Sequence, residues 1–402
     1  MRILSVGNRY PPWSTGGYET TWAGAAHALR EAGHPTRVLT TRADPSDRAV
    51  AGALPTDVHR ELRWYWREHA FPRLRGAECL RIERWNAAVL RGQVRSFAPD
   101  VVMWWAMGGM SLSLLEQARR LGTPALAVVA DDWILYGPEV DAWTRRWRGV
   151  LGGLGAPAAD RFTGIPARLT LDRAARWSFI SEYVLAAARS AGWRLDGASV
   201  EHPGVDPDRF PRRDPRPWGW RLLYCGRIDP RKGIDTAVRA LAQLPAQATL
   251  TIDGDGEPAE LAALRSLAAE LGLEDRVAFR CSPAPDVPHA YAQADAVLFP
   301  VTWREPWGLV PLEAMAVGAP VLASRAGGGP AEYLEPERNC LQFEPGSAAG
   351  LARGLDRLAA GAELRAQLVS GGHATAARFT AGAYHRRLLE RLHESVARGP
   401  EP

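Results

Sequence analysis

The sequence predicts an α/β protein with two doubly wound parallel-sheet domains that face each other across a cleft. Two series of short apolar runs, each followed by a loop and a helical pattern, indicate this class, because strand–helix–strand units build parallel sheets. A Pro-rich stretch over 203–217 separates the two series, and a length of 402 residues fits two domains. We therefore expect an N-terminal domain over 1–202 and a C-terminal domain over 203–384.

The first series begins with the apolar run Ile3–Val6, which predicts a buried strand. A loop rich in Pro and Gly follows over 10–17, then a predicted helix over 18–32 and a strand at Arg37–Thr40. This strand, helix and strand form one unit of a parallel sheet. Further strands are expected at 101–104, 125–129, 177–180 and near Val200.

The second series begins with the strand 222–225, which leads into a loop over 226–233. Ligands of such sheets bind outside the carboxyl ends of the strands, so the loops there are the first place to look for a site. The other elements expected are strands at 248–252, 277–280, 296–299 and 321–324, and helices at about 234–243, 257–271, 310–317, 347–360 and 388–396.

Composition excludes several classes of protein. A net charge of +4 is too weak for a nucleic-acid-binding protein, which gathers basic residues into stripes. No apolar stretch approaches the roughly 18 residues of a membrane span, and the first residues are too short an apolar run for a signal peptide. The four cysteines are widely spaced and form no C-x-x-C pair, which indicates free thiols in a reducing compartment. We expect a cytoplasmic protein without a metal site.

The strongest motif is a pair of glutamates eight residues apart, Glu305 and Glu313. Glu305 follows a predicted strand, and Glu313 falls about one turn inside the next helix. Gly308 frees the backbone at the start of that helix, where unpaired N–H groups and the helix dipole favour an anion. Because carboxylates accept hydrogen bonds from vicinal hydroxyls, the pattern suggests a sugar–phosphate ligand. The plain alternative is a loop glutamate and a solvated helix glutamate around an ordinary turn.

A second motif is the basic loop Gly226–Gly233, which contains Arg227 and Lys232. An arginine fork and a compact ammonium suit phosphate groups, although a basic loop taken alone is more often merely solvated. Lys232 is the only lysine among 49 basic residues. If any positive charge served at this position, arginine should stand there, so the lysine favours a specific role.

Two glycine pairs are weaker signals. Gly16 and Gly17 follow the first strand and would let the backbone approach a ligand, while Gly254 and Gly256 flank an Asp after another strand. A tight turn explains either pair equally well. The chain has neither the G-x-G-x-x-G fingerprint after its first strand nor a G-x-x-x-x-G-K-[ST] loop.

Together these motifs resemble the retaining glycosyltransferases of family 4, which have the GT-B fold of two Rossmann-like domains. The resemblance covers nearly the whole chain and includes the pattern at His202–Asp206; its most specific part is the E-x7-E motif from Glu305 to Glu313. It implies that the N-terminal domain binds the acceptor and the C-terminal domain a nucleotide-diphosphate-sugar donor. It also implies that a terminal helix, about 385–402, crosses back onto the first domain.

The resemblance assigns a role to each candidate residue. Arg227 and Lys232 would bind the diphosphate, Glu305 the donor sugar and Glu313 the ribose hydroxyls. Arg227, Lys232, Glu305 and Asp131 are the candidate catalytic residues. The other residues expected at the donor site are Gly16, Gly17, Gly254, Arg280, Cys281, Gly308, Leu309 and Val310.

The expected chemistry needs no cofactor beyond the nucleotide sugar as co-substrate. No Asp-x-Asp cluster stands in a suitable context, and two cations can neutralise the departing diphosphate, so we expect a metal-independent enzyme. The family resemblance further implies that the anomeric configuration is retained and that the leaving phosphate takes the acceptor's proton.

One departure from the family pattern concerns the donor sugar. Many relatives carry a His-Asp pair after a first-domain strand, where this chain has Ala130, Asp131 and Asp132. Either Asp131 takes over the contact with the sugar, or the donor lacks the hydroxyl that the His meets. A deoxysugar or another unusual sugar would fit.

The acceptor side is less specific, and the candidates are a small molecule, a glycan or a lipid. Of the 16 tryptophans, Trp104 and Trp133 are the candidate acceptor residues, with core packing as the alternative for each. Residues 60–95 hold nine Arg and four Glu and should be helical in part, with a break at Pro72. This segment suits a peripheral contact with an anionic membrane or a solvated helix face. The oligomeric state is not indicated.

Other functions remain open at this point. A GT-B sugar phosphorylase or nucleotide-sugar epimerase would keep the fold, and a non-catalytic glycan-binding protein would use the Trp-rich half. A phosphorylase that uses pyridoxal phosphate needs a Schiff-base lysine, and the only lysine already lies in the basic loop. An epimerase needs its own acid and base. The intact set of two cations and two glutamates favours the transferase.

Overall fold

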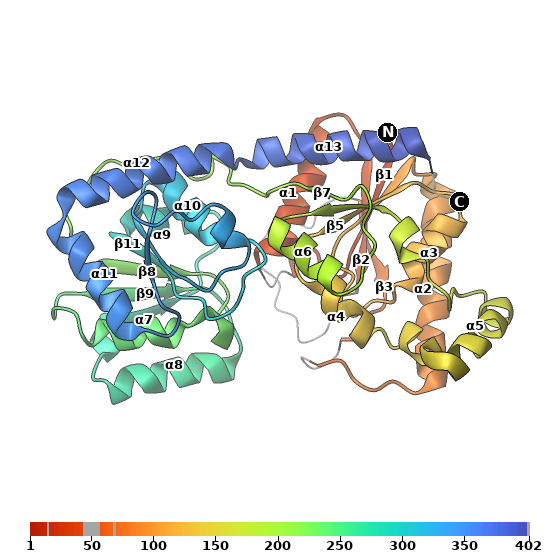
Figure 1. Cartoon of the computed structure of the whole chain (residues 1–402), viewed down its shortest axis with the longest axis horizontal. Helices are drawn as coiled ribbons and strands as arrows, with labels where there is room; N and C mark the ends of the chain where they lie inside the picture. The colour runs from red at the N-terminus through yellow and green to blue at the C-terminus, as the bar shows by residue number, and fades with distance from the viewer. Residues whose placement is uncertain (14–15, 43–56, 67–69, 400–402) are drawn as a thin grey trace. The chain divides into compact units, whose positions relative to one another are not determined.

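A computed structural model of the chain describes residues 1–13, 16–42, 57–66 and 70–399 (Figure 1). Its contacts divide the chain into two compact units. The first unit is Met1–Glu201 with His385–Pro402, and the second unit is His202–Tyr384. This division lies one residue from the expected boundary. Each unit contains one sheet whose strands are all parallel, so the predicted fold class of two parallel-sheet α/β domains is confirmed.

The first unit has a seven-stranded sheet in the order β3-β2-β1-β4-β5-β6-β7. The six strands predicted from the sequence are present, and fully buried strands such as β4 and β5 explain why their apolar runs are continuous. The strands are β1 (Ile3–Val6), β2 (Thr36–Thr41), β3 (Val58–Leu62), β4 (Val101–Trp104), β5 (Ala125–Val129), β6 (Arg176–Phe179) and β7 (Ser199–Val200). The helices are α1 (Gly17–Glu31), α2 (Gly76–Phe97), α3 (Ser113–Arg120), α4 (Trp133–Val140), α5 (Gly149–Thr163) and α6 (Glu182–Ser190).

The segment over 60–95 is helical in part, as expected, because α2 begins at Gly76. Its beginning is different: Arg60 lies in the edge strand β3, which the sequence did not indicate. Residues in β3 are mostly half-buried and polar, so no apolar run marks this strand. Residues 67–69 of the segment lie outside the described residues.

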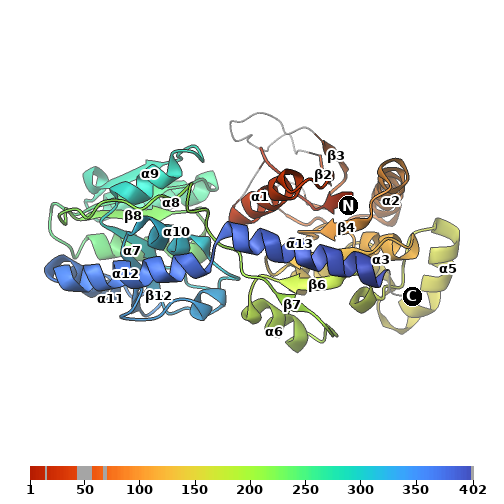
Figure 2. The ribbon, with the colours of Figure 1, turned by 90° about the horizontal axis from the view of Figure 1, so that it is seen from above.

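The second unit has a six-stranded sheet in the order β10-β9-β8-β11-β12-β13. Helix α7 packs against α8 and α11, while α10 packs against α9 and α12, so helices cover both faces of the sheet (Figures 1 and 2). The strands are β8 (Arg221–Cys225), β9 (Thr249–Asp253), β10 (Val277–Arg280), β11 (Ala296–Phe299), β12 (Val321–Ser324) and β13 (Leu341–Phe343). The helices are α7 (Ile234–Leu241), α8 (Pro258–Glu270), α9 (Val287–Gln293), α10 (Leu309–Val317), α11 (Ala348–Ala360) and α12 (Ala362–Arg378).

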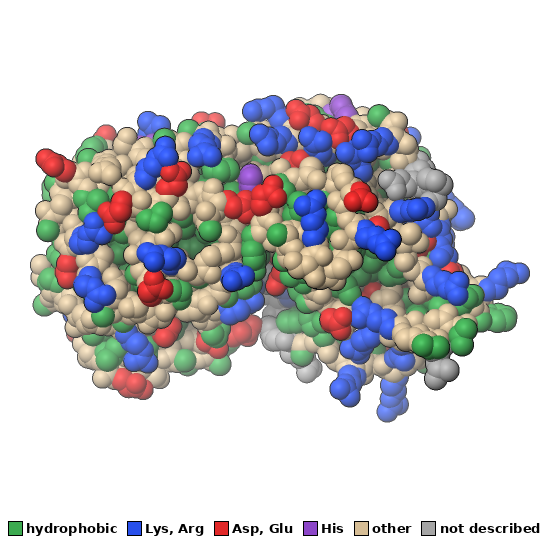
Figure 3. Space-filling model, viewed as in Figure 1, with side chains coloured by type: hydrophobic (Ala, Val, Ile, Leu, Met, Phe, Trp, Pro, Cys, Tyr) green, Lys and Arg blue, Asp and Glu red, His purple; other side chains and the backbone are tan. Residues whose placement is uncertain are grey.

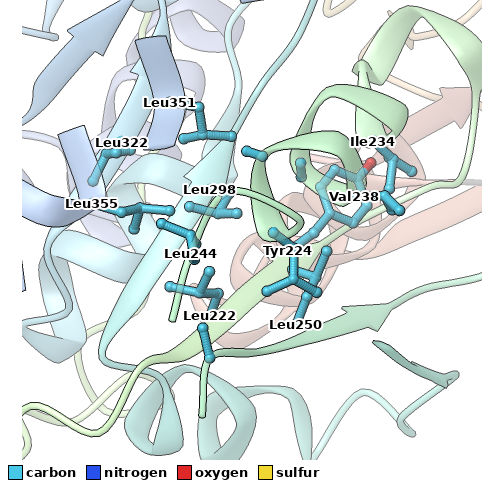
Figure 4. Packing of buried hydrophobic residues seen from close by; sticks show 14 of the residues in the cluster. Leu222, Tyr224, Ile234, Val238, Leu244, Leu250, Leu298, Leu322, Leu351 and Leu355 are labelled. Atoms are coloured by element: carbon cyan, nitrogen blue, oxygen red, sulfur yellow. The ribbon is translucent and has the colours of Figure 1, made fainter. Parts of the chain in front are cut away.

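The core of the second unit lies between the sheet and the α7–α11 layer (Figure 4). Leu222 and Leu298 on adjacent strands meet Val238 of α7 and Leu355 of α11, and each is at most 3% exposed. Burial of each such side chain contributes about 1.5–3 kcal/mol. This packing fixes the strands whose carboxyl ends carry the candidate site.

The terminal helix α13 (Ala381–Arg398) begins in the second unit, and its residues from His385 onward belong to the first. Leu388 and Leu392 are buried, and Arg391 Nε lies 3.0 Å from the carboxylate of Glu201. Residues 400–402 of the predicted helix lie outside the described residues. None of the helices in the described ranges is both long enough and apolar enough to cross a bilayer.

Candidate functional site

The candidate site lies where the strand order of the second unit reverses. Strand β8 pairs with β9 on one side and with β11 on the other, so the loops after β8 and β11 leave the sheet edge side by side at a topological switch point. The two loops are locked together, since Thr302 N donates to Arg231 O at 2.8 Å. A Cβ on Gly233 would lie 2.1 Å from the Pro300 carbonyl oxygen, so only glycine allows this approach.

Lys232 and Glu305 meet across these two loops. Lys232 Nζ donates to both carboxylate oxygens of Glu305 at 2.7 Å, and the two side chains are 14% and 13% exposed. Trp303 Nε1 donates a third hydrogen bond to Glu305 Oε2 at 2.8 Å. An ammonium has three donors, so this arrangement orients Lys232 and keeps one N–H for another acceptor. The structure thus joins the two motifs that the sequence singled out separately.

The backbone of Glu305 is held by a third loop, which follows β12. Gly329 N donates to Glu305 O at 2.8 Å, and Gly328 forms an isolated parallel bridge with Glu305. Gly328 has φ +83°, and a Cβ there would lie 2.4 Å from Glu305 O. The position of this carboxylate is therefore set by three strand ends at once.

Arg227 lies at the start of the basic loop and is 43% exposed. Its Nη2 is 3.8 Å from Asp229, which forms a closer pair with Arg231 at 2.9 Å. The hydrogen bond from Arg231, helped by the charge of Arg227, lowers the pKa of Asp229 to about 2. Asp229 thus partly neutralises two arginines, and the loop retains a net positive charge.

Glu313 is the fifth residue of α10 and is partly buried. Tyr291 of α9, which is fully buried, donates its hydroxyl to Glu313 Oε2 at 2.6 Å. Burial raises the pKa of Glu313 and raises the pKa of the neighbouring Cys225 thiol to about 12. Tyr291 therefore orients one oxygen of a carboxylate in an apolar setting.

The start of α10 is built by a packed aromatic group. Gly308 has φ +81° and precedes the first helical residue, and Tyr333 donates its hydroxyl to the Gly308 carbonyl. Trp307 Nε1 donates to Pro203 O at 2.9 Å, and the His202 ring stacks on Trp307 with centroids 4.6 Å apart. This packing gives the pattern at His202–Asp206 a supporting role. Gly308, Leu309 and Val310 are partly exposed, so the first N–H groups of the helix are placed near the surface.

Gly254 is explained by close backbone packing. A Cβ on Gly254 would lie 1.9 Å from the Gly226 carbonyl oxygen, and one on Gly256 would lie 2.5 Å from the Ile228 carbonyl oxygen. This turn therefore supports the basic loop. Arg280 and Cys281, at the end of β10, are exposed at the same sheet edge, and Gly254 N donates to Arg280 O at 2.9 Å.

The first unit carries the remaining candidates. Gly16 and Gly17 are exposed at the start of α1, immediately after residues 14–15, which lie outside the described residues. Asp131 Oδ1 accepts a hydrogen bond from Trp133 N at 3.0 Å, so this carboxylate caps the start of α4. Ala130 and Asp131 are both partly exposed after β5.

Trp104 and Trp133 are core residues. Each is 0% exposed, Trp104 within β4 and Trp133 at the start of α4. Neither ring is accessible to a ligand in this structure, so their burial disfavours the acceptor role that the sequence suggested. Core packing, the alternative for both, is what the structure shows.

Sequence reasoning missed four residues that shape the site: Trp303, Asp229, Tyr291 and Tyr333. Two of them had a local signal, since Asp229 lies inside the basic loop and Trp303 stands two residues before Glu305. Tyr291 lies 22 residues from Glu313, and only the tertiary fold brings the two together.

Two family models match the chain. Residues 15–209 match Glycosyltransferase Family 4, and residues 213–374 match Glycosyl transferases group 1. The chain belongs to the glycosyltransferases of the family 4 type. The two matches together cover most of the chain, and the second contains Lys232, Glu305 and Glu313.

Curated relatives of this family 4 chain align over part of their length. A GDP-mannose-dependent alpha-(1-6)-phosphatidylinositol monomannoside mannosyltransferase of Mycolicibacterium smegmatis is 37% identical over 180 residues, 39% of this chain and 46% of that protein. A D-inositol 3-phosphate glycosyltransferase of Mycobacteroides abscessus is 37% identical over 154 residues, 35% of this chain and 34% of that protein. The chain thus spans between a third and a half of these relatives.

Solved structures show the fold over the full chain. HepE of Anabaena in complex with UDP has a TM-score of 0.71 and 21% identity, covering 98% of this chain and 100% of that one. Sucrose-phosphate synthase of Thermosynechococcus elongatus has a TM-score of 0.72 and 20% identity, covering 98% and 99%. The GT-B fold that the resemblance implied is confirmed.

Proposed function

We propose that this family 4 chain is a retaining glycosyltransferase, which moves a sugar from a nucleotide-diphosphate sugar to a hydroxyl or amine of an acceptor. The observation that carries the proposal is the pair at the switch point, Lys232 Nζ 2.7 Å from both oxygens of Glu305. A single oriented ammonium beside a fixed carboxylate suits a ligand with a phosphate next to a polyhydroxylated ring.

The cations act on the leaving group. As the bond between the anomeric carbon and the phosphate oxygen breaks, negative charge develops on the diphosphate, and Lys232 and Arg227 are placed to stabilise it. Glu305 holds two of the three Lys232 donors, so the third is already oriented and little reorganisation is needed. We propose that these charges make turnover independent of a divalent metal. Activity that is unchanged by EDTA supports this point.

The carboxylates act on the donor's hydroxyls. Glu305 faces the sugar, and Glu313 accepts from the ribose while Tyr291 orients one of its oxygens. Partial burial makes each hydrogen bond to Glu313 stronger than it would be in water. Gly308, Leu309 and Val310 offer backbone N–H groups at the start of α10, where the helix dipole favours phosphate. Gly16 and Gly17 of the first unit, and Gly254, Arg280 and Cys281 of the second, complete the proposed donor set.

Retention follows if the acceptor attacks the anomeric carbon on the face that the diphosphate leaves. The acceptor oxygen or nitrogen forms the new bond, the bond to the phosphate oxygen breaks, and the acceptor's proton passes to that oxygen. No side chain is then required as a base. Determining the anomeric configuration of the product by NMR tests this step.

The identity of the sugar is the finer part of the proposal. A small residue at Ala130 and an Asp131 carboxylate engaged in capping α4 both favour a donor that lacks one hydroxyl. We therefore propose a deoxysugar or other unusual sugar as the donor's sugar, with a natural product or glycan as the acceptor. If ordinary hexose donors are turned over well and deoxysugar donors are not, this part is wrong.

Slow hydrolysis of nucleotide sugars tests the function without knowledge of the acceptor. The protein is incubated with a panel that varies the base and the sugar, and release of the nucleoside diphosphate is measured. We expect one base and one sugar to be preferred, with release lost in Lys232→Ala. No release from any donor, together with no binding of any nucleoside diphosphate, contradicts the proposed function.

A further inference from the structure

Helix α5 exposes its large apolar side chains to solvent and turns its small side chains toward the first unit. Val150, Leu154 and Phe162 are 83%, 74% and 84% exposed, whereas every other exposed large hydrophobic residue among those described is at most 41% exposed. Spacings of four and eight residues put the three side chains on one stripe of the helix. Large apolar side chains this exposed on one helix mark a candidate interaction site.

The opposite side of α5 is made of small residues. Ala156 is 1% exposed within a cluster that includes Trp143, and Ala159 packs against the same cluster. A Cβ on Gly152 would lie 2.8 Å from the backbone of Trp147. Small residues thus let the helix lie close to the first unit, while its large apolar side chains point away from it.

The surroundings of the stripe are basic. Arg145, Arg146, Arg161 and Arg168 are exposed on or near α5, and within the described part of the chain none of them forms an ion pair. Arg148, by contrast, pairs with Glu139 at 2.7 Å. Hydrophobic and basic side chains stand together over the α5 region at the lower right of Figure 3.

We propose that α5 is an interfacial helix that docks the protein on a bilayer containing anionic lipid. Its apolar stripe enters the boundary between headgroups and acyl chains, and the arginines beside it meet the negative surface. At 15 residues α5 is too short to span a bilayer, so it lies in the plane of the interface. A second copy of the chain fits less well, because a symmetric contact would bring the arginines of both copies together. The proposal does not depend on the proposed function, since binding is measured without turnover.

Vesicle flotation of the full chain tests the proposal. The vesicles are phosphatidylcholine alone or phosphatidylcholine with phosphatidylglycerol, at low and at high salt. We expect flotation with the anionic vesicles, weakened by salt. The double variant Leu154→Ser and Phe162→Ser should lower the vesicle affinity about tenfold or more, because two inserted side chains are lost. Leu271→Ser, which changes an exposed leucine of the second unit, is the matched control and should bind like the wild type.

The charge contribution is tested separately with Arg161→Gln and Arg168→Gln, matched by Arg239→Gln on α7. The first pair should weaken binding to anionic vesicles and reduce its dependence on salt. Donor hydrolysis should be unchanged in all these variants. The proposal would be overturned if the wild-type protein did not bind anionic vesicles, or if the double variant Leu154→Ser and Phe162→Ser bound them as well as the wild type. It would also be overturned if the wild-type protein were a dimer that this double variant converted to a monomer, because the stripe would then be the contact between two copies.

Discussion

Lys232 and Glu305 lie 73 residues apart in the chain, yet Lys232 Nζ is 2.7 Å from both carboxylate oxygens of Glu305. The two residues come from the loops after β8 and β11, which are adjacent strands where the sheet order reverses. Parallel strands bring both loops to one edge, so the pairing is a direct consequence of the topology.

Lys232→Ala should lower donor turnover about 100-fold or more, because the oriented ammonium facing the leaving group is lost. Lys232→Arg should also lose activity, since a planar guanidinium does not replace a compact ammonium held by two oxygens. Initial rates of nucleoside diphosphate release measure both effects.

Arg239→Ala, an exposed arginine on α7, is the control and should keep full turnover. Thermal unfolding shows whether Lys232→Ala keeps the fold. If it does not, the double variant Lys232→Ala and Glu305→Gln removes the unpaired carboxylate, and comparison with Glu305→Gln alone isolates the loss of the ammonium. Near-normal turnover in a folded Lys232→Ala protein would reject the assigned role.

Tyr291→Phe should raise the KM for the donor about tenfold and leave kcat within a factor of a few. The variant leaves one Glu313 oxygen without the hydroxyl that orients it, at 2.6 Å, and a hydrogen bond to a charged group is worth about 1.5–3 kcal/mol. Glu313→Ala should remove most turnover. Glu270→Gln on the exposed side of α8 is the control. An unchanged KM in Tyr291→Phe would mean that Glu313 does not meet the donor.

Gly254→Ala should destabilise the second unit by about 1–3 kcal/mol, because the new Cβ would lie 1.9 Å from a backbone carbonyl that cannot move aside cheaply. Gly92→Ala in α2 is the matched substitution with no atom within 4 Å, and it should be neutral or stabilise by up to about 1 kcal/mol. Urea unfolding of both variants measures the difference. Equal stabilities would show that the two loops do not pack as described.

Glu83 should make the stability of the first unit depend on pH. It is 1% exposed and accepts hydrogen bonds from Tyr65 and Ser113. Burial, with a further contribution from nearby Asp141, raises its pKa from about 4.5 to about 7. The folded protein therefore binds the proton more tightly than the unfolded chain, and the free energy of unfolding falls as pH rises between these values, by at most about 3 kcal/mol.

Glu83→Gln should flatten this dependence, because the amide does not titrate. The measurement is thermal unfolding between pH 5 and pH 8, a range that includes the raised pKa of Glu83. The variant is compared with the wild type and with Glu31→Gln, which changes an exposed residue of α1. The account would be contradicted if the wild-type stability rose from pH 5 to pH 8, or if Glu83→Gln showed the same pH dependence as the wild type.

The sequence predicts the buried strands well, because β4, β5 and β11 are continuous apolar runs whose burial is complete. It misses the edge strand β3, because its residues are mostly half-buried and polar and show no apolar run. It singles out Lys232, Glu305 and Glu313 by their spacing and by the lone lysine, and the structure brings Lys232 and Glu305 together. It does not find Tyr291, whose contact with Glu313 depends on how α9 packs against α10. For Trp104 and Trp133, composition alone did not distinguish a binding ring from a core ring.

Calorimetric titration of nucleoside diphosphates tests the central claim most directly, because it asks only whether the basic loop binds a diphosphate. Wild-type protein and Lys232→Ala are titrated with UDP, GDP, ADP, CDP and TDP, with Arg239→Ala as the control. The account predicts that the wild type and the control bind at least one of them with the same affinity, and that Lys232→Ala binds it about tenfold or more weakly. Equal binding by Lys232→Ala, or no binding of any of the five by the wild type, contradicts it.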